Sequence, residues 1–150
     1  MRNAAFVAGL LCLSPMVWAD CPYKGTWVQR SGTKEFGMTM TAEDAGPGCK
    51  LTYRASGTKA PPGGELVIVS MLDGKDAPNL LDGKPTGQTM AIRTIDSRHW
   101  VTVLKYQGKQ TGISKGELSP DGKVLKSEDE MAASGPNASA VKNVQYWDKR

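Results

Sequence analysis

The sequence predicts an all-β protein, an antiparallel up-and-down barrel of eight to nine strands. Short apolar or alternating runs follow one another at close spacing, separated by Gly, Pro and Asp turns. No window keeps a helical apolar stripe for three turns. Such a meander forms either a sandwich or a barrel. We favour the barrel, because closure removes the edge strands that a small sheet would otherwise expose.

Four strands are expected in the first half of the chain, at residues 25–30, 36–41, 49–55 and 65–72. The second of these alternates, with Phe36, Met38 and Met40 on one face. The fourth contains the most hydrophobic run, rich in β-branched residues, so we expect both of its faces to be buried. A Pro-Pro-Gly-Gly break at residues 61–64 precedes it.

Five more strands are expected in the second half, at residues 89–95, 98–106, 110–118, 123–131 and 140–147. Asp96-Ser97 is read as a two-residue hairpin turn between the first two. The other turn signals are residues 73–75, 82–84, 108–109, 119–122 and 134–137. The last strand is expected to pair with the first and close the barrel.

Residues 1–19 are predicted to be a secretory signal peptide, leaving residues 20–150 as the mature domain. Arg2 supplies a positive n-region, residues 4–13 are an apolar h-region, and Pro15 ends that region. Val17 and Ala19 place small residues at positions −3 and −1 of a cleavage site. The alternative is an N-terminal core helix. The apolar stretch is too short to span a bilayer, so no membrane span is expected.

Export makes a disulfide the expected state of the two cysteines in the mature chain. Cys12 lies in the predicted signal peptide, which leaves Cys21 and Cys49 as an even pair in an oxidising compartment. The loop that this bridge closes predicts about 3–4 kcal/mol of stabilisation. A redox or metal role is the weaker alternative, because there is no Cys-x-x-Cys motif.

Composition excludes several protein classes but names no activity. The 150 residues fit one domain, and 39% hydrophobic residues are too many for a disordered chain. A formal net charge of +4 suits a mildly basic, soluble protein. The lysines are scattered singly among turns, so no nucleic-acid partner is predicted.

The sequence predicts no enzyme, no cofactor and no metal site. His99 is the one histidine, and next to a hairpin turn an exposed or paired imidazole is expected rather than a catalytic base. Glu128 and Glu130 share one face of a strand, which we interpret as a solvated face. Several methionines could supply thioether ligands, but at alternate strand positions they are expected to fill the barrel.

The barrel interior is the remaining candidate site. Strand alternation predicts these inward-facing residues: Trp27, Met38, Met40, Leu51, Tyr53, Ile68, Met90, Ile92, Trp100, Leu104, Val144 and Tyr146. The candidate ligand-binding residues among them are Trp27, Met38, Met40, Tyr53, Met90 and Trp100. An eight-stranded barrel either holds one small ligand or is filled by its own side chains, and both alternatives stay open.

A set of motifs resembles a family of small secreted bacterial proteins described as lipocalin-like. Gly25-Thr26-Trp27 is similar to the Gly-x-Trp signature that opens lipocalin barrels. Further motifs follow in order: Asp73-Gly74-Lys75-Asp76-Ala77-Pro78, Ile92-Arg93-Thr94-Ile95-Asp96, Ser119-Pro120-Asp121-Gly122-Lys123 and Asn143-Val144-Gln145-Tyr146-Trp147-Asp148-Lys149. Trp147 replaces the tyrosine that the resemblance leads us to expect, and the Cys21–Cys49 pair is not a feature of the family. The resemblance implies a fold and no activity.

The functional expectation is an exported, non-enzymatic barrel, periplasmic or secreted, that binds a small apolar ligand in its interior. The alternative is a periplasmic protein-interaction or enzyme-inhibitor module that acts through barrel-end loops, such as residues 61–64 or Leu80-Leu81. A hydrolase or isomerase that works inside the barrel ranks last, because the chain has a single histidine.

Overall fold

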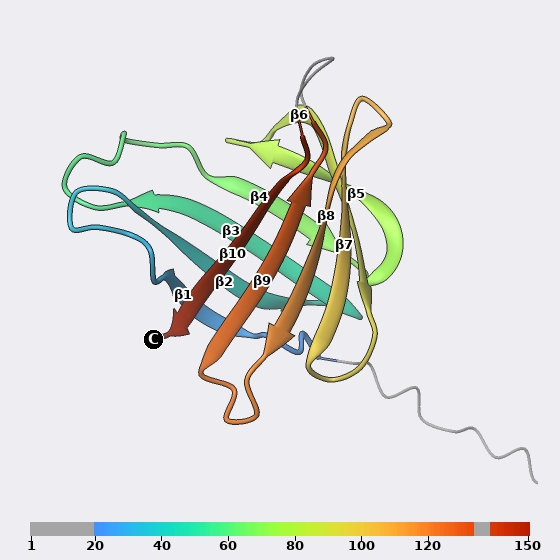
Figure 1. Cartoon of the computed structure of the whole chain (residues 1–150), viewed down its shortest axis with the longest axis horizontal. Helices are drawn as coiled ribbons and strands as arrows, with labels where there is room; N and C mark the ends of the chain where they lie inside the picture. The colour runs from blue at the N-terminus through green and yellow to red at the C-terminus, as the bar shows by residue number, and fades with distance from the viewer. Residues whose placement is uncertain (1–19, 134–138) are drawn as a thin grey trace, which may run out of the picture.

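The computed structural model describes residues 20–133 and 139–150, which form an all-β barrel (Figure 1). The predicted signal peptide and the predicted turn at 134–137 lie outside the described residues. Ten strands follow one another along the chain: β1 (Gly25–Gln29), β2 (Gly37–Ala45), β3 (Gly48–Ser56), β4 (Leu66–Ser70), β5 (Asp73–Leu81), β6 (Lys84–Thr94), β7 (His99–Tyr106), β8 (Lys109–Leu118), β9 (Val124–Met131) and β10 (Val141–Lys149).

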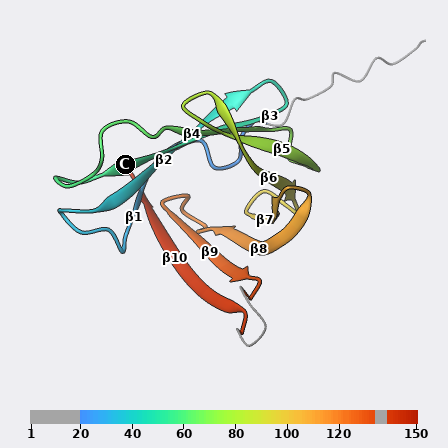
Figure 2. The same cartoon turned by 90° about the horizontal axis from the view of Figure 1, so that it is seen from above.

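Each strand pairs antiparallel with its neighbour in sequence, and β10 pairs back onto β1 to close the barrel. Seen from above, the sheet curls round so that β10 approaches β1 (Figure 2). The predicted antiparallel, up-and-down topology is therefore confirmed. Among the described residues there is no helix long and apolar enough to cross a membrane.

The strand count is ten rather than eight or nine, because the sequence reading missed β5. That strand begins with Asp73 and Gly74, which are typical of a turn, and contains Pro78, which cannot donate a ladder hydrogen bond. It pairs with β4 over only two residue pairs and shifts register twice against β6. The strand forms nonetheless, because its inward residues Ala77 and Asn79 are buried.

Alternating turns define two ends of the barrel. The turns at residues 46–47, 71–72, 95–98 and 119–123 lie at one end, which we call the closed end. The connections at residues 30–36, 57–65, 82–83 and 107–108 lie at the other, which we call the open end, together with residues 132–133 and 139–140.

The segment before β1 plugs the closed end. Trp27 is fully buried, and its indole Nε1 donates a hydrogen bond to the backbone oxygen of Tyr23 at 2.8 Å. The ring of Tyr23, 2% exposed, packs against Trp100 of β7. Residues 21–24 and the side chain of Trp27, which we together call the plug, thus seal this end of the barrel.

A disulfide ties the plug to the sheet. Cys21 is bonded to Cys49 at the start of β3, with 5.1 Å between the Cα atoms, which confirms the predicted bridge. Both cysteines are buried. The carboxylate of Asp44 accepts a hydrogen bond from the backbone N–H of Cys21 at 3.0 Å and pairs with the ammonium group of Lys24. The segment is therefore anchored covalently and by charge.

Candidate ligand cavity

The interior of the barrel encloses a cavity of about 770 Å³. This volume lies within the range of small-molecule sites, roughly 300–1,000 Å³. Tyr23 and Trp100 line the cavity on the side of the closed end, whereas Gly64 and Lys142 line it at the open end. The interior is therefore a container that extends toward the open end, rather than the solid core that the sequence left as an alternative.

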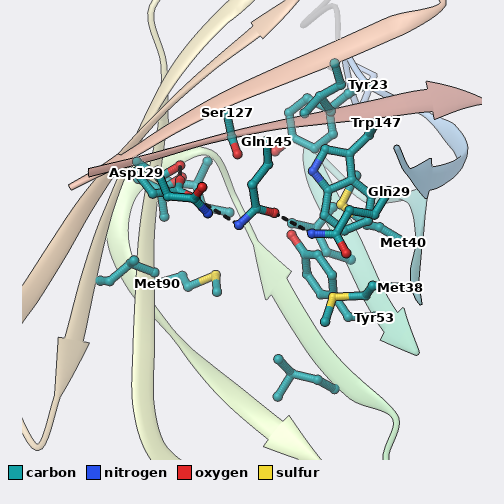
Figure 3. A pocket seen from close by; sticks show the side chains of 18 of the residues that line it. Tyr23, Gln29, Met38, Met40, Tyr53, Met90, Ser127, Asp129, Gln145 and Trp147 are labelled. Atoms are coloured by element: carbon teal, nitrogen blue, oxygen red, sulfur yellow. Dashed lines mark hydrogen bonds between the residues drawn. The ribbon is translucent and has the colours of Figure 1, made fainter. Parts of the chain in front are cut away.

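One wall of the cavity is apolar. It is formed by inward-facing residues of β2, β3, β4, β6 and β7: Met38, Met40, Leu51, Leu66, Met90, Ile92, Trp100 and Leu104. Methionine side chains adapt their shape to an apolar guest at low cost. Figure 3 shows Met38 and Met90 on different sides of the cavity, as expected from strands that are not neighbours.

The opposite wall carries a row of polar side chains. The residues are Gln29 of β1, Ser114 of β8, Ser127 and Asp129 of β9, and Gln145 of β10. We call them the polar row. Cross-strand register brings them together, because Ser114 is paired with Asp129 and Ser127 with Gln145.

Hydrogen bonds connect most of the polar row (Figure 3). The hydroxyl of Ser114 donates to Oδ1 of Asp129 at 2.5 Å, and Nε2 of Gln145 donates to Oδ2 at 3.3 Å. Nε2 of Gln29 in turn donates to Oε1 of Gln145 at 2.9 Å. The row thus ends on a carboxylate that faces the cavity.

Glycines on the inward face of β8 make room for large neighbours. A Cβ atom on Gly116 would lie 1.9 Å from the Trp100 ring, and one on Gly112 would lie 2.6 Å from the sulfur of Met131. The indole of Trp100 therefore fills the space over Gly116. Between the two glycines, Ser114 is the side chain that β8 contributes to the polar row.

Tyr53 stands beside the polar row. Burial, and to a smaller extent the negative charge of Asp129, raise the pKa of its phenol to about 12. Its ring meets Trp147 edge-on, with the centroids 6.3 Å apart. The surface that Tyr53 still exposes lines the cavity. The phenol is therefore a neutral hydrogen-bonding group inside the barrel at physiological pH.

Five of the six candidate ligand-binding residues line the cavity: Met38, Met40, Tyr53, Met90 and Trp100. Trp27 does not, because it is fully buried in the plug. Of the other residues expected to face inward, Leu51, Ile92 and Leu104 line the cavity. Ile68 is fully buried in the core and does not line the cavity.

The prediction for β10 was wrong by one residue. Val144 and Tyr146 are 50% and 39% exposed, and Asn143, Gln145 and Trp147 line the cavity instead. The apolar residues were assumed to face inward, but this wall is polar. On the outer face, the guanidinium of Arg30 lies 5.3 Å from the Tyr146 ring centroid.

The polar row is the feature that the sequence reading missed. The signal was present on β9, where Glu128 and Glu130 share the outer face. Asp129 must then face inward, together with Leu125 and Ser127.

His99 lies away from the cavity, beside the turn at residues 95–98. Its Nδ1 is 2.8 Å from a carboxylate oxygen of Asp96, and its side chain is 40% exposed. Backbone N–H donation from Arg98 and the contact with His99 lower the pKa of Asp96. The imidazole is therefore a turn-stabilising group. Within residues 20–133 and 139–150, no group of three or more His, Cys, Asp or Glu side chains is arranged to hold a metal ion.

Comparison of the chain with protein-family models, with curated proteins and with solved structures finds no match.

Proposed function

We propose that this chain is an exported, non-enzymatic, lipocalin-like barrel that binds a small apolar ligand in its interior. The observation that supports this most directly is the cavity of about 770 Å³ with one apolar wall. A plugged closed end and a lining that reaches the open end suit a container with one entrance.

Displacement of a neutral apolar fluorescent probe, followed by native mass spectrometry, tests the proposal. We expect one ligand per chain at micromolar concentration. The variant Met90→Trp adds bulk inside the cavity and should abolish binding, whereas Val69→Trp, at a 44% exposed position, should not. Absence of binding to the wild-type protein, or equal binding by both variants, would contradict the proposal.

Export to the periplasm or beyond the cell is a second part of the proposal. The leader pattern of residues 1–19 supports it, and so does a disulfide placed between two buried cysteines. N-terminal sequencing of the exported protein should give Asp20 as the first residue. Recovery of the full-length chain from the cytoplasm alone would contradict it.

A protein-interaction module that acts through the open end is the second candidate. Exposed apolar side chains at this end support it: Phe36, Leu81, Tyr106 and Val141, with exposed fractions of 44–62%. Residues 61–64 are exposed there as well. In this case the double variant Phe36→Asp/Tyr106→Asp should lose inhibition or capture of a periplasmic enzyme, while Met90→Trp keeps it. The reverse pattern would exclude this candidate.

A further inference from the structure

We propose that the ligand of the cavity is a cationic amphiphile, an organic ammonium ion with an apolar body, held at its head by Asp129. This inference rests on the proposed container function and narrows its ligand class. A carboxylate inside an apolar container selects for positive charge and selects against an acid.

Asp129 is the only acidic side chain that lines the cavity in the part of the chain that the structure describes. Two cationic side chains also line it, Arg54 and Lys142, but each is paired elsewhere. Arg54 donates to the carboxylate of Glu65 at 3.0 Å, and Lys142 lies 3.7 Å from Glu130. Their side chains are 57% and 78% exposed, so both belong to the rim of the open end.

No Lys, Arg or His nitrogen of residues 20–133 or 139–150 lies within 4.0 Å of the Asp129 carboxylate. Its protein partners are the neutral donors Ser114 and Gln145. These donors orient the carboxylate and leave its charge uncompensated. A buried or half-buried charge is costly unless it is paired, so the missing partner is the chemical feature that a ligand can supply.

The carboxylate retains capacity for more hydrogen bonds. An ionised carboxylate accepts about four, and the side chains of the polar row fill two of these positions. The hydroxyl of Ser127, on the same inward face of β9, and the phenol of Tyr53 supply further acceptors for an ammonium group. An ammonium ion carries up to three N–H donors, which matches this set better than a single hydroxyl does.

Aromatic rings in the cavity lining also favour a cation. Tyr53 is close enough to Asp129 for the charge to raise the pKa of the phenol, and Trp147 meets the Tyr53 ring edge-on. Both rings line the cavity, so their faces can attract positive charge. The apolar wall of Met38, Met90 and Leu104 then accommodates the hydrocarbon body.

Three ligands with the same tail test the proposal: dodecylammonium, dodecanol and dodecanoate. Each is titrated by calorimetry at pH 7, the two ions below their micelle concentrations and the alcohol below its solubility limit. We expect wild-type protein to bind the ammonium ion at one site per chain, about tenfold or more tighter than the alcohol. Dodecanoate should bind more weakly than the alcohol. This comparison needs no variant.

Two variants then test whether the Asp129 carboxylate causes the preference for the ammonium ion over the alcohol. Asp129→Asn keeps the shape of the side chain and should reduce the ammonium-to-alcohol ratio to about one while leaving alcohol affinity within about twofold. Glu128→Gln removes the same charge from the adjacent residue on the outer face, where the side chain is 51% exposed, and should keep the ratio. Near-ultraviolet circular dichroism checks that both variants are folded.

Alcohol binding without a preference for the ammonium ion would overturn the cationic ligand and leave the container function standing. A preference that survives Asp129→Asn, or one that Glu128→Gln removes, would also overturn it. Binding of none of the three ligands would overturn the container function together with this inference.

Discussion

Tyr23 packs against Trp100 with ring centroids 4.5 Å apart, although Tyr23 precedes the first strand and Trp100 is the second residue of the seventh. The contact joins the N-terminal plug to the inward face of the barrel wall. Because both rings line the cavity, the same contact forms the floor of the candidate site. Stability at the closed end and the shape of the cavity are therefore linked through this pair.

Replacement of Tyr23 by alanine should open the closed end. We expect a loss of about 3–5 kcal/mol in the free energy of unfolding, since a large buried ring is removed. Urea titration measures it. Iodide should also quench tryptophan fluorescence more strongly in the variant, because Trp100 loses the ring that packs against it. Tyr106→Ala is the matched control, because Tyr106 is 47% exposed and its removal should cost no more than about 0.5 kcal/mol. Equal costs at the two positions would show that the plug does not stabilise the barrel.

The disulfide should stabilise the barrel without being required for its fold. Reduction, or the double variant Cys21→Ala/Cys49→Ala, should lower the free energy of unfolding by about 3–4 kcal/mol. The far-ultraviolet circular dichroism of the β-sheet should remain, because the ten-strand ladder does not depend on the bridge. Thiol titration of unfolded, unreduced mature protein should find no free thiol. Two free thiols per chain would refute the bridge in solution.

Gly116 should be intolerant of even one methyl group. Its Cβ position lies 1.9 Å from the Trp100 ring, so Gly116→Ala must displace the indole, and we expect a cost of about 1–3 kcal/mol. In a Trp100→Leu background the same substitution should cost less, because the ring that obstructs it is gone. A double-mutant cycle of unfolding free energies measures this coupling. Additive effects would show that the ring contact is not the cause.

The sequence predicted the β-meander from local alternation, the closure from the need to remove edge strands, and the disulfide from an even pair of cysteines. Alternation around Met38 and Met40, and two cysteines in a predicted exported chain, are readable one segment at a time. β5 was missed because Asp73-Gly74 and Pro78 follow the local rules of a turn. The sheet overrides those rules by pairing the strand on both sides.

The polar row could not be found by placing every apolar residue inside. That rule holds for a filled core, where an inward Gln or Asp would be unpaired. Here Gln145 and Asp129 face a cavity and are hydrogen-bonded to each other, so the apolar Val144 and Tyr146 face outward. Whether the barrel is hollow depends on how side-chain volumes from all ten strands add up. Small inward residues such as Gly112 contribute to that result only through contacts between strands.

Tyr53 should make the barrel sensitive to high pH. Its pKa is about 12 in the folded protein against 10.0 for an ordinary tyrosine, because burial and then the Asp129 charge disfavour the phenolate. Since the folded-state pKa is the higher one, the contribution to stability is complete below pH 10 and is lost as the pH rises toward about 12. The free energy of unfolding should therefore fall more steeply over this window in the wild-type protein than in Tyr53→Phe.

Absorbance at 295 nm separates the two causes of the raised pKa. The difference between wild-type and Tyr53→Phe titrations isolates this phenol from Tyr23, whose pKa burial also raises. In Asp129→Asn the Tyr53 midpoint should move down but stay above 10.0, because burial, the larger cause, remains. A midpoint at the ordinary value in the wild-type protein would mean that water reaches the phenol freely, and the cavity would then be too open to hold an apolar ligand. A midpoint unchanged by Asp129→Asn would separate the carboxylate from the ring and remove one of the reasons for placing a cation between them.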